Sequence, residues 1–212
     1  MNNNNVLDYA LLSAFIPTFF FVSITPGMCM TLALTLGMSI GIKKTMWMMI
    51  GELAGVALVA TSAVIGVAAI MLNYPNLFIV LKWIGGAYLI WIGINMWRNK
   101  GKMSLNLNNP DQPTERFQLM SQGFITAIAN PKGWAFMISL LPPFINVDKS
   151  VPHQMMVLIS IILATEFISM MAYATGGKSL RIFLSKGDNV RFLNRIAGTL
   201  MVGVGIWLIL ID

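Results

Sequence analysis

Six long apolar runs decide what this chain can fold into. They cover about residues 9–40, 46–72, 77–97, 117–144, 154–175 and 195–211. About 20 apolar residues in a helix cross the hydrocarbon core of a bilayer. Because that core offers no water to bond the backbone, a single spanning segment must be a helix. The runs therefore predict an all-α membrane protein with six transmembrane helices.

The composition excludes an ordinary soluble domain. Hydrophobic residues make up 57% of the chain and charged residues only 10%, whereas a soluble domain has about 25% charged residues. A pI near 9.7 does not indicate nucleic-acid binding here, because the basic residues lie almost wholly in loops between apolar runs. The expected partner is the lipid bilayer.

The basic residues also predict an orientation. They concentrate in the first, third and fifth loops, and an excess of lysine and arginine marks the cytoplasmic side. Both termini are then expected on the outer side. The first run lacks a basic n-region and a cleavage pattern, so we interpret it as a retained span and not as a signal peptide.

Two of the runs are interrupted by helix-breaking residues. The breaks are Thr25-Pro26-Gly27 in the first run and Asn130-Pro131-Lys132-Gly133 in the fourth. Thr25 and Asn130 are suitable N-caps, and a following proline suits the first position of a helix. We expect each break to start a half-helix inside the membrane, whose free N–H groups favour an anion. The alternative is a plain proline kink that a neighbouring helix or water fills.

The two halves of the chain resemble each other. Residues 82–89 resemble residues 194–201, Glu52 in the second run corresponds to Glu166 in the fifth, and the breaks correspond as well. Three spans per half is an odd number, so the halves must insert in opposite directions. This predicts one domain, 1–212, built of two inverted three-helix repeats (about 1–100 and 117–212) joined by a polar linker, 98–116. Transporters commonly follow this plan; the alternative is that glycine and proline recur by composition.

Three charged residues lie well inside the runs: Glu52, Lys132 and Glu166. A charge at the bilayer centre costs about 2.5–3.5 kcal/mol, so these groups must face a wet cavity or pair with one another. We expect the two breaks and Lys132 to hold a carboxylate, and Glu52 or Glu166 to meet an amine or to carry a coupling proton. A substrate with both groups is an amino acid. The alternative is a salt bridge between Lys132 and one glutamate that only holds helices together.

Enzyme and cofactor chemistry is not expected. Cys29 is the single cysteine, and no metal-ligand spacing, nucleophile elbow or phosphate loop occurs. The prediction is a transporter without a cofactor, a metal or a catalytic site. A passive pore, another small-molecule efflux permease, a membrane redox carrier and a scaffold stay open as alternatives.

Several motifs resemble the lysine exporter family, close to its homoserine/threonine resistance and leucine exporter branch. They are Val22-Ser23-Ile24-Thr25-Pro26-Gly27, Ile84-Gly85-Gly86-Ala87-Tyr88-Leu89, Asn130-Pro131-Lys132-Gly133 with Phe136, and Phe144-Ile145-Asn146-Val147. The resemblance covers nearly the whole chain. It implies a multi-pass exporter of amino acids in the bacterial inner membrane, driven by proton antiport. Pairing into a homodimer is a further expectation.

The first break departs from the family pattern. The family commonly has Pro-Gly-Pro followed by asparagine and a hydroxyl residue, whereas Pro26-Gly27 is followed here by Met28-Cys29-Met30. Apolar side chains thus replace a polar one. We expect a larger or more apolar substrate than is usual in the family.

Overall fold

A computed structural model describes residues 9–98, 115–141, 144–145, 150–185 and 187–210. Every regular secondary-structure element among them is helical, as predicted, and most of the linker (99–114) lies outside them. The α-helices are α1 (Tyr9–Ile24), α2 (Met28–Ser39), α3 (Ile42–Asn73), α4 (Pro75–Arg98), α5 (Arg116–Ile128), α6 (Pro131–Leu140), α7 (Val151–Ser185) and α8 (Gly187–Leu210).

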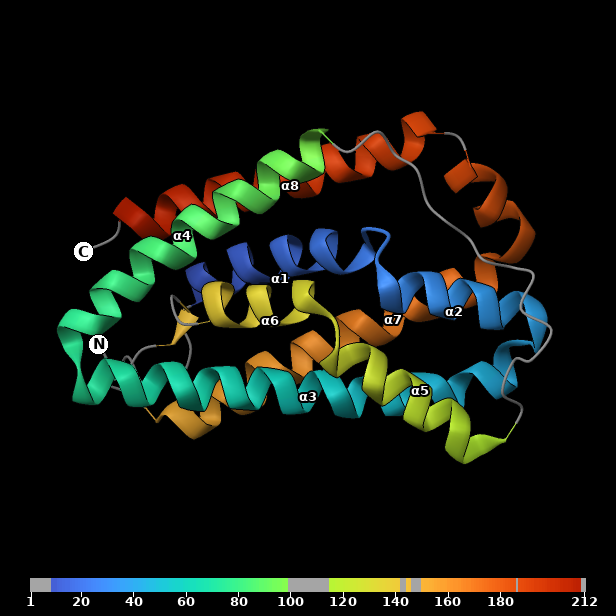
Figure 1. The fold of residues 1–212 in the computed structure, drawn as a ribbon, viewed down its shortest axis with the longest axis horizontal. Coiled ribbons are helices and arrows are strands. Elements are labelled where there is room, and N and C mark those ends of the chain that lie inside the picture. The colour runs from blue at the N-terminus through green and yellow to red at the C-terminus, as the bar shows by residue number, and fades with distance from the viewer. Residues whose placement is uncertain (1–8, 99–114, 142–143, 146–149, 186, 211–212) are drawn as a thin grey trace.

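The helices run back and forth along the long axis of the molecule (Figure 1). α1 and α2 together cross from the left end to the right, with a bend of 55° between them. α5 and α6 cross in the opposite direction, and their break lies beside the first one near the middle of the molecule. The α2–α3 turn lies at the right end and α5 starts at the lower right, whereas α4 ends at the top near the middle. Lys43, Arg98 and Arg116 belong to these segments.

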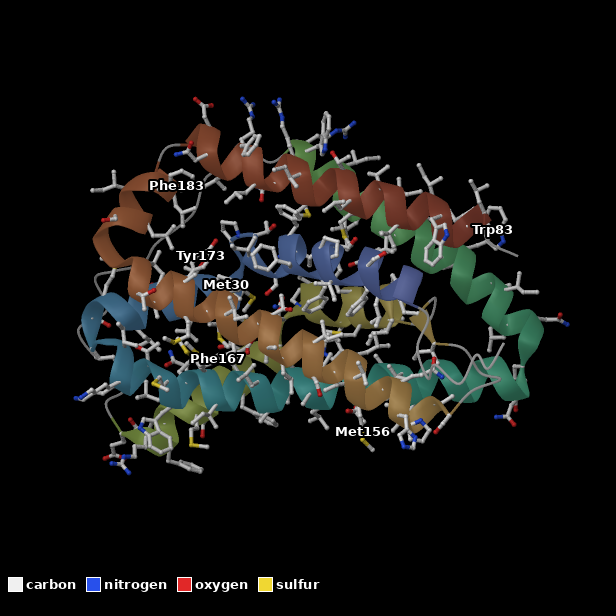
Figure 2. All side chains as sticks on the ribbon, turned by 180° about the vertical axis from the view of Figure 1, so that it is seen from behind. Met30, Trp83, Met156, Phe167, Tyr173 and Phe183 are labelled. Atoms are coloured by element: carbon white, nitrogen blue, oxygen red, sulfur yellow. The ribbon has the colours of Figure 1, made fainter. Side chains whose placement is uncertain are left out.

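In the part of the chain that the structure describes, two helical segments are long and apolar enough to cross a membrane by themselves, Ile42–Gly66 of α3 and Val151–Gly177 of α7. A third span results when the bent pair Phe15–Ile24 and Met28–Ser39 counts as one. Large apolar side chains lie on the outside, among them Trp83 and Met156, while Tyr173 is buried inside (Figure 2). This outer surface suits contact with lipid; six spans in inverted repeats stay a prediction.

Small residues let α4 and α8 cross in close contact. A Cβ atom on Gly86 would lie 2.8 Å from the Gly205 carbonyl oxygen, and one on Gly205 would lie 2.7 Å from the Gly86 oxygen. Gly93 and Gly198 face each other in the same reciprocal way, at 2.6 Å. Only residues without a side chain allow the two backbones to approach this closely, as in many membrane helix pairs.

The last two helices are longer than predicted. α7 kinks at Gly177, a further helical segment runs from there to Ser185, and α8 already begins at Gly187. The prediction of a basic loop over residues 176–194 was therefore wrong. A basic segment can be helical as well as irregular, since lysine and arginine are good helix formers. Gly177 interrupts the helix with φ 44° and ψ −130°, a conformation that favours glycine.

Candidate functional site

The second break forms as the sequence predicts. α5 ends at Ile128 and α6 starts at Pro131, the proline standing in the first turn. Asn130 is the N-cap: its Oδ1 atom accepts a hydrogen bond from the Lys132 backbone N–H at 3.1 Å. Cap and proline together fix a helix start in the middle of the molecule.

The first break forms differently. Gly27, in an extended conformation, is the N-cap of α2 and supplies no side-chain cap. The Thr25 hydroxyl instead donates back to the Phe21 carbonyl at 2.6 Å, so the expectation that Thr25 caps the new helix was wrong. Its hydroxyl satisfies a carbonyl in the last turn of α1. As a consequence, no side chain caps the first N–H groups of α2.

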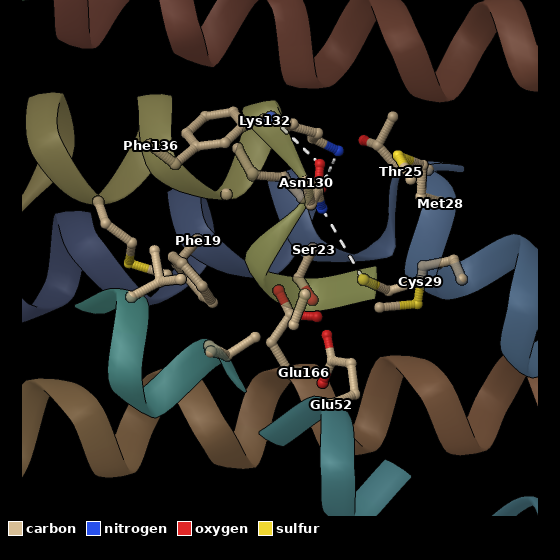
Figure 3. A pocket seen from close by; sticks show the side chains of 18 residues that line it. Phe19, Ser23, Thr25, Met28, Cys29, Glu52, Asn130, Lys132, Phe136 and Glu166 are labelled. Atoms are coloured by element: carbon tan, nitrogen blue, oxygen red, sulfur yellow. Dashed lines mark hydrogen bonds between the residues drawn. The ribbon is translucent and has the colours of Figure 1, made fainter. Parts of the chain in front are cut away.

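Both breaks open onto one cavity of about 50 Å³ (Figure 3). The predicted residues that line it are Thr25, Gly27, Glu52, Asn130, Lys132 and Glu166. Pro26 and Pro131 are not among its lining residues; they lie within the breaks. The cavity therefore brings together side chains or backbone from α2, α3, α6, α7 and the two break segments.

Lys132 points its ammonium at the first break. Nζ donates to the Val22 carbonyl at 3.0 Å and lies 5.8 Å from the centroid of the Phe136 ring. A Cβ atom on Gly27 would come within 3.8 Å of Nζ. Within the described part of the chain, no carboxylate lies within ion-pair distance of Nζ. The structure thus has no direct salt bridge of the kind that was the alternative for Lys132.

Two carboxylates occupy the other side of the cavity (Figure 3). Glu52 is only 1% exposed, and its Oε2 atom has no hydrogen-bond partner among the described residues. Glu166 lies within electrostatic range of both Glu52 and Lys132. The cavity is therefore polarised, with one cation on one wall and two acids on the other.

The sequence interpretation missed three polar residues beside the site. The Ser23 hydroxyl donates to Ser169 at 3.2 Å, and the Tyr173 hydroxyl donates to the Ile24 carbonyl at 2.8 Å. Glu166, Ser169 and Tyr173 are spaced three and four residues apart, which places them on one face of a helix. That spacing was a usable signal. The structure also places Cys29 in the lining, with Asn130 Nδ2 at 3.8 Å from its sulfur.

Comparison with known proteins identifies the family. Residues 20–211 match the family model described as LysE type translocator. An uncharacterized membrane protein of Vibrio cholerae is 25% identical over 95% of this chain and 98% of its own length. The homoserine/homoserine lactone efflux protein of Salmonella typhimurium is 26% identical (91% and 92%), and the leucine efflux protein of Enterobacter sp. is 26% identical (87% and 88%).

No solved structure matches the chain significantly. The family match nevertheless covers most of the sequence, and the named relatives agree with the branch that the motifs indicated. The protein belongs to the LysE type translocators, and it is a membrane transporter and not an enzyme.

Proposed function

We propose that this protein exports an amino acid, or a close derivative, from the cytoplasm by proton antiport through the cavity between the two breaks. One observation carries the proposal: a lysine ammonium beside an uncapped helix start faces two carboxylates across one cavity. Two relatives are named as efflux proteins for homoserine, homoserine lactone and leucine.

The substrate carboxylate binds between Lys132 and the start of α2. An ammonium carries three donors, and among the described residues Lys132 Nζ has one acceptor, the Val22 carbonyl. The first turn of α2 adds backbone N–H groups without a side-chain cap and the positive end of the helix dipole. Gly27 keeps the space beside Nζ free of a side chain. Two positive groups so close together are best satisfied by a shared anion.

The opposite wall takes the substrate amine or the proton. Glu52 lines the cavity, and its Oε2 atom has no hydrogen-bond partner among the described residues. A buried carboxylate needs a cation, a proton or donors. Glu166 lies close enough to Glu52 for one proton bound by the pair to affect both. A substrate ammonium and a proton then compete for the same two acids, which would couple export to proton entry.

The rest of the lining contacts the substrate side chain. Met28, Met30, Phe19 and Phe136 contribute apolar surface, which supports a larger or more apolar substrate. Alternating access requires the helices around the cavity to move during transport.

The helix arrangement supports inverted repeats in the inner membrane. The repeat aligns Gly86 with Gly198 and Gly93 with Gly205, and these are the residues that meet reciprocally between α4 and α8. A two-fold axis in the membrane plane between the two helices produces this pattern. The α2–α3 turn, after which α3 starts with Lys43 and Lys44, and the start of α5 at Arg116 both lie toward the right side of the molecule (Figure 1), which supports a cytoplasmic position for that side and an outer position for both termini.

Reconstitution in proteoliposomes tests the proposal. Efflux of a panel of amino acids is measured with and without an inwardly directed proton gradient. Antiport predicts that the gradient accelerates export of at least one apolar amino acid. Flux that does not depend on the proton gradient would favour a passive pore. The absence of flux for every amino acid tested would contradict the proposed substrate class.

A further inference from the structure

A second hollow lies between α4 and α8, apart from the transport cavity. Its volume is about 300 Å³. Its lining consists of Ile94, Trp97, Arg98, Thr199 and Val202. It lies where α4 ends, and the last turn of α4 carries Arg98. The groove therefore combines an apolar body with a cationic rim.

Close packing holds the groove in shape. The contact between Gly93 and Gly198 brings the helices together just beside it. The Trp97 indole N–H donates to the Arg195 carbonyl and to the Thr199 hydroxyl, both at 3.0 Å, so the ring is fixed although half of its surface is exposed. A rigid, half-exposed tryptophan is typical of the membrane interface.

Two arginines lie at this groove, and no acid lies near them on their own helices. The Arg195 guanidinium lies 5.7 Å from the centroid of the Trp97 ring, and Arg98 lines the groove from the last turn of α4. α4 contains no aspartate or glutamate, and the one acid of α8, Asp188, is two turns away from Arg195. The rim is thus charged and open to an anion.

We propose that the groove binds one anionic phospholipid. The guanidinium groups of Arg98 and Arg195 hold the phosphate, since their fork of donors matches phosphate oxygens. The first part of an acyl chain lies on Ile94, Trp97 and Val202. A soluble anion would contact only the arginines and leave the apolar wall uncovered. A lipid at the basic side of the membrane contacts the arginines with its phosphate and the apolar wall with its acyl chain, as lipids do in basic pockets between membrane helices.

Native mass spectrometry of the full-length protein in mild detergent tests the proposal, with phosphatidylglycerol and phosphatidylcholine as probes. The wild type is expected to retain one phosphatidylglycerol in preference to phosphatidylcholine. Arg98→Gln and Arg195→Gln are each expected to lower the association constant of phosphatidylglycerol about fivefold. This is the effect of one basic residue near a charged membrane surface. Arg116→Gln is the matched control, because Arg116 also lies over a tryptophan, Trp47, at 5.0 Å, but outside this groove.

Ile94→Trp separates a lipid from a simple anion. This variant keeps both arginines but fills the apolar part of the groove, so phosphatidylglycerol binding should be lost. Retention of phosphatidylglycerol by Ile94→Trp, its displacement by inorganic phosphate, or equal binding of the two lipids would each overturn the proposal. None of these outcomes depends on which substrate the protein transports.

Discussion

Replacement of Lys132 by methionine separates a transport role from a structural one. Methionine keeps the length of the side chain and removes the charge. A charge at membrane depth costs about 2.5–3.5 kcal/mol. Its removal takes the charged donor from the Val22 carbonyl, which keeps the Thr25 backbone N–H, and a hydrogen bond to a charged group contributes about 1.5–3 kcal/mol. The two terms nearly cancel, so we expect Lys132→Met to fold with unchanged or slightly raised Tm.

Transport should respond strongly to the same change. A hydrogen bond to a charged group contributes about 1.5–3 kcal/mol, which corresponds to about a tenfold to hundredfold rise in the half-saturating substrate concentration. Efflux in proteoliposomes and thermal unfolding in detergent measure the two effects on one preparation. Lys44→Met, at an exposed lysine, is the control for the effect of a lysine-to-methionine substitution as such.

A structural lysine would give the opposite result. Breaking a buried ion pair costs about 3–5 kcal/mol, or about 6–20 °C in Tm for a chain of this size. A fall of that size in Lys132→Met, or unchanged efflux kinetics, would refute the reasoning.

Three further predictions concern the acids, the helix crossing and the cysteine. At least one of Glu52→Gln and Glu166→Gln should lose the acceleration of efflux by an inward proton gradient; if both variants keep it, the coupling proton is bound elsewhere. Gly205→Ala should lower Tm by about 2–12 °C, because its Cβ would clash with a backbone carbonyl at a cost of about 1–3 kcal/mol. Gly203→Ala is the control and should not lower Tm, because a Cβ at Gly203 would have nothing within 4 Å. Equal Tm values for the two variants would contradict the close crossing of α4 and α8. Alkylation of Cys29 by a small thiol reagent should slow when the transported amino acid is present. An alkylation rate that is the same with and without the amino acid would place the substrate outside this cavity.

Local chemistry explains which parts of the fold were predictable. Outside the two breaks, the described parts of the six apolar runs are largely helical. The sequence predicts this well because an apolar run is a property of neighbouring residues. The start of α6 was predicted to the residue, since the cap of Asn130 and the position of Pro131 involve one turn of chain. The extension of α7 beyond residue 175 was missed because basic residues suit a helix in water as well as a loop.

Tertiary contacts explain which parts of the site were not predictable. Thr25 has two local partners to choose from, the new helix or the old one, and the sequence does not indicate that it bonds back to Phe21. The hydrogen bond between Ser23 and Ser169 joins residues 146 positions apart. The sequence predicted three intramembrane charges that need one another or water; it did not predict that Lys132 and the glutamates lie on opposite walls.

The most direct test compares an exported amino acid with its amino alcohol, which keeps the ammonium and lacks the carboxylate. Binding of both compounds is measured by calorimetry to the wild type and to Lys132→Met. If the carboxylate meets Lys132 and the start of α2, the wild type binds the amino acid at least about tenfold more tightly than the alcohol, and Lys132→Met binds the two more nearly alike. If the variant discriminates between them as strongly as the wild type does, the carboxylate binds elsewhere and the proposed site is wrong.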